Sequence, residues 1–310
     1  MDGKTLWYIG KRLLLAAATV LAVITLTFFA ARAVPGNPFI REGKALSPQA
    51  LAALEEKYGL NKPLGQQYFL YLKNIVTDFD FGTSLEQEDR PVTTIIADGL
   101  QHSARLGLIA AAVAVTVGIL LGAVAALNRG GVWDRLIMVT TTAFVSLPAF
   151  VTGSVLLLFL SERWGWFPAH GETWQGQVLP VITLALYPLA TIARLTRSSM
   201  LDVLGQDYIR TARAKGVSRP KILFGHALKN ALLPVITYLG PMLAYIITGS
   251  LVVERIFNLK GIGVEFVSSI TARDYPLIMG TTTVLAMLVV LMTLLSDVLY
   301  RVIDPRITLK

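Results

Sequence analysis

The chain has 310 residues, of which 54 % are hydrophobic and only 15 % are charged. Ordinary globular domains carry roughly 25 % charged residues, while disordered chains and coiled coils need a high charge or a strict repeat, so all three classes are excluded. No cysteine is present, which excludes a disulfide framework, a thiol nucleophile and a thiolate metal site. The net charge of +8 would suit nucleic-acid binding in a soluble protein, but the placement of the charges indicates a membrane.

Six stretches of the chain lack Asp, Glu, Lys and Arg over the length of about 20 residues that a membrane-spanning helix needs. A soluble chain of this length has too few polar residues to cover six such helices. A cleaved signal peptide is the alternative for the first stretch, but its apolar core exceeds the ~7–15 residues of such peptides. We therefore expect six transmembrane helices, over Leu13–Ala31, Leu106–Asn128, Leu136–Ser161, Thr173–Ala193, Asn230–Val253 and Tyr275–Ser296.

Two features within these stretches concern helix packing. Gly118 and Gly122 have the small-xxx-small spacing that lets helix backbones approach closely, and we expect it to serve packing inside the bundle, with contact to another subunit as the alternative. Prolines within the third, fourth and fifth stretches each remove a helix hydrogen bond and predict kinks. These prolines are Pro148, Pro180, Pro188, Pro234 and Pro241.

The distribution of Lys and Arg predicts the orientation, because these residues concentrate in cytoplasmic loops. Eight of them lie between Arg194 and Lys229, and others flank the amino terminus, the loop after the second stretch and the carboxyl tail. The short loops on the opposite side carry only Arg163, Arg255, Lys260 and Arg273, and the long segment after the first stretch is exempt from this rule because of its length. We therefore expect both termini and residues 206–229 to be cytoplasmic, and residues 34–101 and 161–177 to lie outside.

The outer segment between the first two helices contains signs of folding. Ser47-Pro48-Gln49 is typical of a helix start, and Leu51, Leu54 and Tyr58 follow on one helical face. A second amphipathic helix is expected over Gln66–Val76. Two roles remain open for this segment: a small cap on the helix bundle, or a docking surface for an external partner.

Signs of enzyme chemistry are lacking. The three histidines, His102, His170 and His226, are divided between the two sides of the membrane, and neither HExxH nor GxSxG occurs. Gly43-Lys44 lacks the earlier glycine and the following Ser or Thr of a phosphate loop, so we interpret it as a surface turn. No ionisable residue lies in the middle of a span, which disfavours an ion-driven carrier and a charge-selective channel.

Residues 207–234 form the most informative segment, DYIRTARAKGVSRPKILFGHALKNALLP. A helix is expected over Asp207–Ala214, with Gly216 ending it in the left-handed conformation. Ser218 is expected to cap a second short helix that has Pro220 in its first turn. The expected product is a compact helix–turn–helix with a mixed apolar and basic surface. It is either a solvated positive loop or a contact for another protein.

This segment resembles the coupling loop of binding-protein-dependent ABC importers, in the form found in the peptide and nickel subfamily. Ala212 and Gly216 match the loop's general pattern, while Arg210 and Thr211 replace its Glu and first Ala, and His226 and Lys229 replace an apolar residue and Pro. The same subfamily pattern continues along nearly the whole chain. It includes PGNP at 35–38, DFG at 80–82, RLTRSSM at 194–200, RDYP at 273–276 and DPRI at 304–307. Residues 46–48, 56–61 and 246–250 are most similar to the first membrane subunit of oligopeptide importers.

The resemblance implies an all-α integral membrane protein with six transmembrane helices and the type I ABC importer permease fold, multi-pass in a bacterial inner membrane. It implies helix 1 within residues 1–33, an extracytoplasmic segment at 34–100, a permease domain at 101–301 with its coupling loop at 201–232, and a tail at 302–310. The implied partners are a homologous second permease subunit, two cytoplasmic ATPase subunits, an extracytoplasmic substrate-binding protein and membrane lipid, and no nucleic acid. ATP and Mg would be bound by the ATPase subunits, so this chain would have no catalytic site, no metal and no cofactor of its own.

The implied function is passage of oligopeptides from the binding protein across the membrane. Dipeptide, glutathione or nickel uptake by the same architecture remains an alternative, and a secondary carrier or channel is a further one. The ATPase-coupling residues expected from the resemblance are Asp207, Arg210, Thr211, Ala212, Gly216, Ser218 and His226. Because the spans lack charge, we expect hydroxyl groups to line the path, with Thr140, Thr141, Thr142 and Thr248 as candidates.

Overall fold

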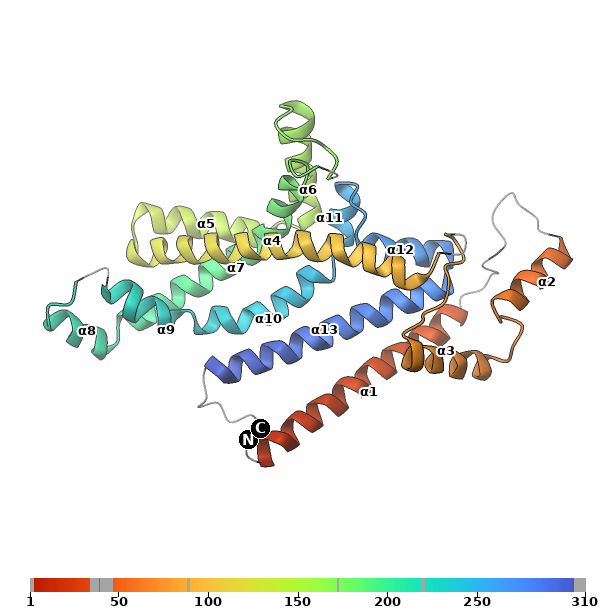
Figure 1. Cartoon of the computed structure of the whole chain (residues 1–310). Helices are drawn as coiled ribbons and strands as arrows, with labels where there is room; N and C mark the ends of the chain where they lie inside the picture. The colour runs from red at the N-terminus through yellow and green to blue at the C-terminus, as the bar shows by residue number, and fades with distance from the viewer. Residues whose placement is uncertain are drawn as a thin grey trace. The chain divides into compact units, whose positions relative to one another are not determined.

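The computed structural model describes residues 3–33, 39, 47–87, 90–171, 173–218 and 221–303, and these residues fold into helices joined by short connections (Figure 1). The predicted features at 35–38, 43–44 and 304–307 lie outside the described residues. The elements are α1 (Gly3–Ala33), α2 (Pro48–Lys57), α3 (Leu64–Asp78), α4 (Val92–Leu127), α5 (Val132–Ser146), α6 (Ala149–Leu156), the π-helical η1 (Leu157–Arg163), α7 (Val178–Leu204), α8 (Asp207–Ala214), the π-helical η2 (Lys221–Leu228), α9 (Lys229–Ala231), α10 (Leu233–Ile247), α11 (Leu251–Ile256), α12 (Ile262–Ala272) and α13 (Tyr275–Ile303).

Four of these helices, α1, α4, α7 and α13, are long and apolar enough to cross a membrane by themselves. Two bent pairs bring the number of spans to six if each pair crosses once, namely α5 with α6–η1, and η2–α9 with α10. Each of the six predicted stretches therefore corresponds to one helix or one bent pair. Several helices extend beyond the predicted stretches into charged sequence: α4 already begins at Val92 and α7 continues to Leu204, while α7 begins after Thr173.

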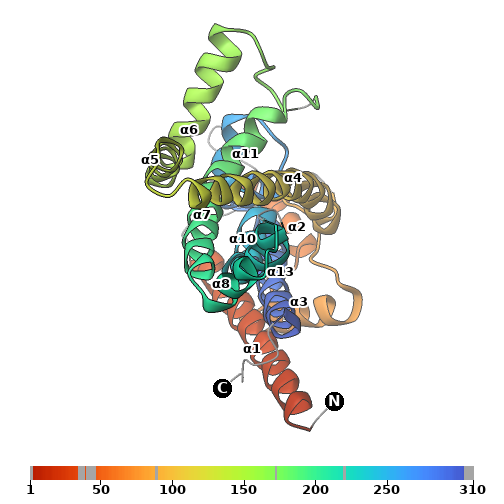
Figure 2. The same ribbon diagram turned by 90° about the vertical axis from the view of Figure 1, so that its left-hand side faces the viewer.

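The third span is broken at its proline. The helix direction bends by 106° between α5 and α6–η1, and α6 turns away from α5 in both views (Figure 1, Figure 2). Pro148 has no N–H to donate and disfavours helical angles in the residue before it, and Leu147 accordingly is extended at φ −86° and ψ 127°. Pro188, by contrast, lies inside a continuous α7. A proline in a predicted span therefore marks a possible break, and the surroundings decide whether it occurs.

Two compact units make up the chain, the first formed by residues 1–102 and 260–290 and the second by residues 103–259 and 291–310. In the first unit, α2 begins as predicted, with the Ser47 hydroxyl accepting a hydrogen bond from the Ala50 N–H at 3.2 Å. The predicted amphipathic helix is α3, and its Tyr68 and Leu72 pack against the buried Phe28 of α1. Residues 34–100 therefore include folded structure.

Asp274 joins the loop before α4 to the start of α13 in the first unit. Its buried carboxylate accepts hydrogen bonds from the Ser84 hydroxyl at 2.5 Å, from the N–H groups of Leu85 at 3.0 Å and Glu86 at 3.1 Å, and from the N–H of Leu277 at 3.1 Å. The last bond caps the amino terminus of α13, where a negative charge is favourable. The loop is thereby held on the last helix.

In the second unit, α4 packs against α7 through its two glycines. A methyl group added at Gly118 would lie 2.9 Å from the Leu189 carbonyl oxygen, and one added at Gly122 would lie 2.6 Å from the Thr196 Cβ. Both positions thus require glycine because the backbone of α7 approaches so closely. The predicted role of this spacing in packing inside the bundle is confirmed.

A buried ion pair fixes the start of α5 to α7 in the same unit. Arg197 donates from Nε to Asp134 Oδ1 at 2.5 Å and from Nη2 to Oδ2 at 2.8 Å, and the Gly130 N–H also donates to Oδ2 at 2.8 Å. The Asp134 side chain is 5 % exposed and the Arg197 side chain 27 %. This two-pronged geometry is the strongest that a guanidinium and a carboxylate can form.

We predict that Asp134→Ala destabilises the protein, because it leaves the Arg197 guanidinium, whose side chain is only 27 % exposed, without its partner. Thermal unfolding of the purified protein in detergent measures the effect. The double variant Asp134→Leu with Arg197→Met should be less damaging than either single change, since it removes both charges. Asp202→Ala, at an exposed position of α7, is the matched control. Equal melting temperatures for wild type and Asp134→Ala would contradict the assigned role.

Candidate functional site

The predicted coupling segment begins with α8 and ends that helix as expected. Gly216 has φ +73°, its N–H donates to the Arg213 carbonyl at 3.0 Å, and the Val217 N–H donates to the Ala212 carbonyl at 3.1 Å. This pair of bonds is the Schellman ending, in which a residue with positive φ satisfies the last free carbonyls of a helix. The predicted left-handed turn at Gly216 is therefore confirmed.

A small core of its own holds this segment together. Ile209 of α8 is buried against Ile222 and Ala227 of η2, and Ala212 and Val217 pack on the same cluster. Tyr208 and Asn230 add a hydrogen bond of 2.9 Å between the tyrosine hydroxyl and the amide nitrogen. The helical turns on either side of Gly216 are thus locked in one arrangement. We call residues 207–231 the coupling knob; Figure 1 shows it at the end of α7.

The outer surface of the coupling knob mixes apolar and basic side chains. Tyr208 is 44 % exposed and Phe224 is 64 % exposed, although both are large aromatic residues. Arg210, Arg213 and Lys215 are exposed beside them. Exposed aromatic residues next to arginine are typical of protein interfaces, which favours a protein contact over a merely solvated loop.

The predicted coupling residues occupy different parts of this knob. Asp207 and Arg210 form an exposed ion pair at 3.5 Å, and the Thr211 hydroxyl donates to the Asp207 carbonyl at 3.0 Å. Ser218 is exposed, and its carbonyl accepts from the Ile222 N–H at 3.0 Å, which begins the next helix. That second helix is π-helical over Lys221–Leu228 and becomes α-helical at α9. Pro220 and the side chain of His226 lie outside the described residues.

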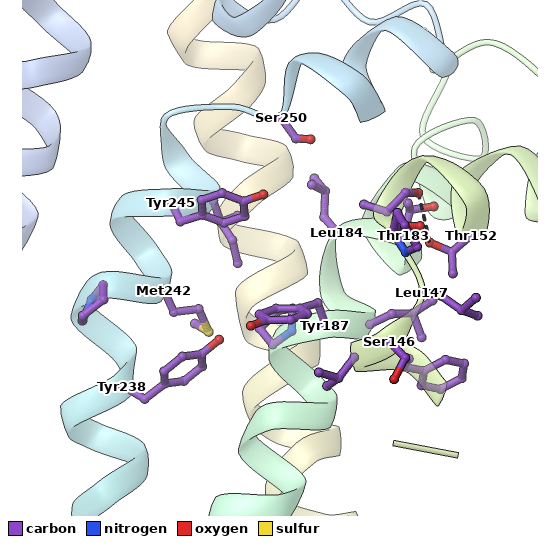
Figure 3. A pocket seen from close by; sticks show the side chains of 18 residues that line it. Ser146, Leu147, Thr152, Thr183, Leu184, Tyr187, Tyr238, Met242, Tyr245 and Ser250 are labelled. Atoms are coloured by element: carbon purple, nitrogen blue, oxygen red, sulfur yellow. Dashed lines mark hydrogen bonds between the residues drawn. The ribbon is translucent and has the colours of Figure 1, made fainter. Parts of the chain in front are cut away.

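A cavity of about 630 Å³ lies elsewhere in the second unit, at the break between α5 and α6. Its walls come from the residues around Leu147–Pro148, from α7 near Pro188 and from α10 near Pro241. Three prolines thus adjoin it, where helix backbones deviate from regular packing. Figure 3 shows Tyr187 of α7 and Tyr238 of α10 with their hydroxyl groups directed toward one another across this space.

The cavity lining is apolar apart from hydroxyl groups. Those of Ser146, Thr152 and Thr183 donate to carbonyls of their own helices, at 2.9, 3.0 and 2.8 Å. Tyr187, Tyr238 and Tyr245 present larger side chains whose hydroxyls can both donate and accept hydrogen bonds (Figure 3). No charged side chain is among the residues that line it. Such a site suits a guest with amide N–H and C=O groups and offers it no fixed ionic partner.

The four threonines predicted to line a path are not among the residues around this cavity. Thr141 is buried and donates to the Met138 carbonyl at 3.1 Å, Thr142 donates to the same carbonyl at 2.7 Å, and Thr140 is exposed. Thr248 donates to the Ala244 carbonyl at 3.0 Å. Their role as path lining stays a prediction. None of the three cavity tyrosines was predicted to line a path, although Tyr238 and Tyr245 are seven residues apart and so share a helix face.

The described residues contain no group of three or more His, Cys, Asp or Glu side chains that could hold a metal ion.

Comparison with known proteins places these features in a family. Residues 118–309 match the family of binding-protein-dependent transport system inner membrane components, and residues 5–100 match the N-terminal part of such membrane components. The oligopeptide transport system permease protein OppB of Haemophilus influenzae is 44 % identical over 305 residues, covering 97 % of this chain and 98 % of the relative. The dipeptide transport system permease protein DppB of Bacillus subtilis is 45 % identical, with the same coverage.

Solved structures agree in fold. The MetNI methionine ABC transporter in inward-facing conformations superposes with a TM-score of 0.55 at 16 % identity, over 68 % of this chain and 97 % of that chain. An amino acid ABC transporter crystallised with histidines gives 0.52 at 18 % identity, over 69 % and 95 %. Six candidate spans, the coupling knob and the full-length sequence match converge on one conclusion. The chain belongs to the family of binding-protein-dependent transport system inner membrane components, with the type I ABC importer permease fold.

Proposed function

We propose that this protein is the membrane subunit of an ATP-driven importer that carries peptides across the bacterial inner membrane. The observation that carries the proposal is the match over 97 % of the chain to relatives named as oligopeptide and dipeptide permeases. The uncharged, hydroxyl-bearing cavity supports it, because such a lining can pair with a peptide backbone without selecting among side chains.

In this proposal the chain performs no catalysis. It pairs with a homologous second permease subunit, receives substrate from an extracytoplasmic binding protein and contacts two cytoplasmic ATPase subunits, which hold the ATP and Mg. The coupling knob is the contact with an ATPase, and its internal core and hydrogen bonds let it move as one body. Nucleotide on the ATPases shifts the permease between two states only if the contact differs between them.

The alternatives differ in what they require of this chain. Dipeptide, glutathione or nickel uptake would use the same architecture, with selectivity in the binding protein. A secondary carrier or channel, by contrast, needs no ATPase. That alternative therefore gives no reason for the exposed aromatic residues of the coupling knob.

The substrate is tested with the reconstituted complex in proteoliposomes. We expect uptake of labelled peptides that requires ATP and the binding protein, with little dependence on side chains, because the cavity offers no charged partner. Uptake of labelled nickel or glutathione without transport of peptides of any length would contradict the peptide assignment. Uptake without ATPase subunits would contradict the assignment of the protein to an ATP-driven importer.

The orientation is tested by single-cysteine labelling, for which the chain has no cysteine background. We expect Gln66→Cys, exposed on α3, to react with an impermeant maleimide in cells whose outer membrane is opened. Lys215→Cys, exposed in the coupling knob, should react only after the inner membrane is opened. The reverse pattern would invert the proposed topology.

The coupling role is tested at Gly216. A methyl group there would meet nothing within 4 Å in this chain, so the effect expected within this subunit arises from the positive φ. Gly216→Val should introduce about 1–3 kcal/mol of backbone strain and sharply lower the ATP hydrolysis that loaded binding protein stimulates. Assembly, followed by co-purification of the subunits, should survive.

Two matched variants separate backbone strain at Gly216 from the effect of a changed side chain in this turn. Gly216→Asn should be milder than Gly216→Val, because Asn tolerates the left-handed region. Lys215→Val, at the neighbouring residue with φ −76°, should leave stimulation near the wild-type level. An assembled Gly216→Val complex with normal stimulation would show that this turn does not transmit the signal.

A further inference from the structure

A second cavity, of about 370 Å³, lies within the first unit, where α1 ends and α13 begins. Arg32 of α1, Gln67 of α3 and Tyr275 of α13 are on its wall. We propose that this cavity binds the headgroup of a membrane phospholipid, with the phosphate on Arg32. The proposal goes beyond the proposed function, because it requires neither peptide nor ATPase.

The Arg32 guanidinium is held in place, and among the described residues it has no anionic partner. Its central carbon lies 3.6 Å from the centre of the Phe28 ring, and Nε donates to Gln67 Oε1 at 3.0 Å. Nη1 reaches the Phe28 carbonyl at 3.5 Å and the Met279 sulfur at 3.6 Å. Across the described part of the chain no carboxylate pairs with it. A half-buried guanidinium that still has N–H groups available to donate favours an anion with two oxygens, such as a phosphodiester.

Charges of both signs surround the remainder of the cavity. Lys57 and Lys62 line it together with Glu56 and Asp80. A small inorganic anion would use the cationic groups but leave the two carboxylates without a partner in the guest. The mixture of charges suits a zwitterionic headgroup, whose phosphate can face Arg32 while its ammonium group meets a carboxylate. The class of lipid that fits is therefore phosphatidylethanolamine.

The position of the cavity favours a lipid over the carboxylate of a peptide. The candidate span of α1 ends at Ala33 and that of α13 begins at Tyr275, so Arg32 lies where the hydrocarbon region gives way to headgroups. Large apolar side chains close to this level are exposed, with Leu26 of α1 at 71 % and Phe69 of α3 at 71 %. Acyl chains would cover such surfaces. In the proposed orientation the site belongs to the outer leaflet.

The test uses the complete importer complex, purified in detergent and stripped of endogenous lipid. Dioctanoyl phosphatidylethanolamine is titrated, and native mass spectrometry follows the lipid adducts on this chain. We expect Arg32→Gln to weaken binding about ten-fold, the loss expected for one charge-assisted pair. Lys73→Gln, at an exposed position of α3 that does not line the cavity, is the matched control and should bind as wild type does.

A second variant keeps the proposal testable if Arg32→Gln fails to fold. Lys62 is exposed on the cavity rim, so Lys62→Gln should leave the fold intact and weaken binding by about two- to five-fold. Equal adduct formation by wild type and both cavity variants would overturn the proposal. So would displacement of the lipid by inorganic phosphate or by a peptide at equal concentration. Because the readout is lipid binding, a failure here is distinct from a failure to transport peptides.

Discussion

The two-pronged ion pair between Asp134 and Arg197 is the constraint on which the second unit depends. It joins α5 to α7 just before α7 leads into the coupling knob. The Gly130 N–H, in the loop before α5, donates a hydrogen bond to the same carboxylate. The loop at Gly130, the start of α5 and the distant Arg197 of α7 thus share one negative charge. A displacement of the coupling knob that moved α7 would carry the start of α5 with it, because separating the pair would leave two charges poorly solvated.

The cavity lies at the other end of α5 and along the first half of α7. Leu147–Pro148 interrupts the third span there, and Tyr187 of α7 faces Tyr238 of α10 across the same space. The ion pair at Arg197 and the cavity wall at Tyr187 are therefore parts of the same helix. Because the ion pair holds α5 to α7 and Pro148 breaks the span after α5, a movement of α7 would change the shape of the cavity. Proline breaks near a binding space are typical of membrane helices, since irregular backbone is tolerated where it lines a cavity.

Much of this architecture could be predicted from local patterns in the sequence. The six apolar stretches, the start of α2 at Ser47-Pro48 and the left-handed turn at Gly216 each depend on a few neighbouring residues, and the structure confirms them. The glycine pair at 118 and 122 was predictable for the same reason, because a short spacing on one helix face is sufficient to indicate close packing.

What could not be predicted depends on contacts between distant segments. Pro148 breaks its span while Pro188 does not, although the two residues are chemically identical. The cavity hydroxyls come from helices that are adjacent only after folding, so a search for polar residues within single spans selected threonines that do not line it. The pairing of Asp134 with Arg197 spans 63 residues and likewise had no local signal.

The neutrality of the cavity has a consequence for how the importer responds to its surroundings. The groups that change charge between pH 5 and 8 in proteins are chiefly histidines and shifted carboxylates or amines, and none of these lines the cavity. A proton gradient therefore has nothing to act on within this space. Acidification of the medium could alter the charge of a guest molecule, but it would leave the charge of the side chains that line this cavity unchanged.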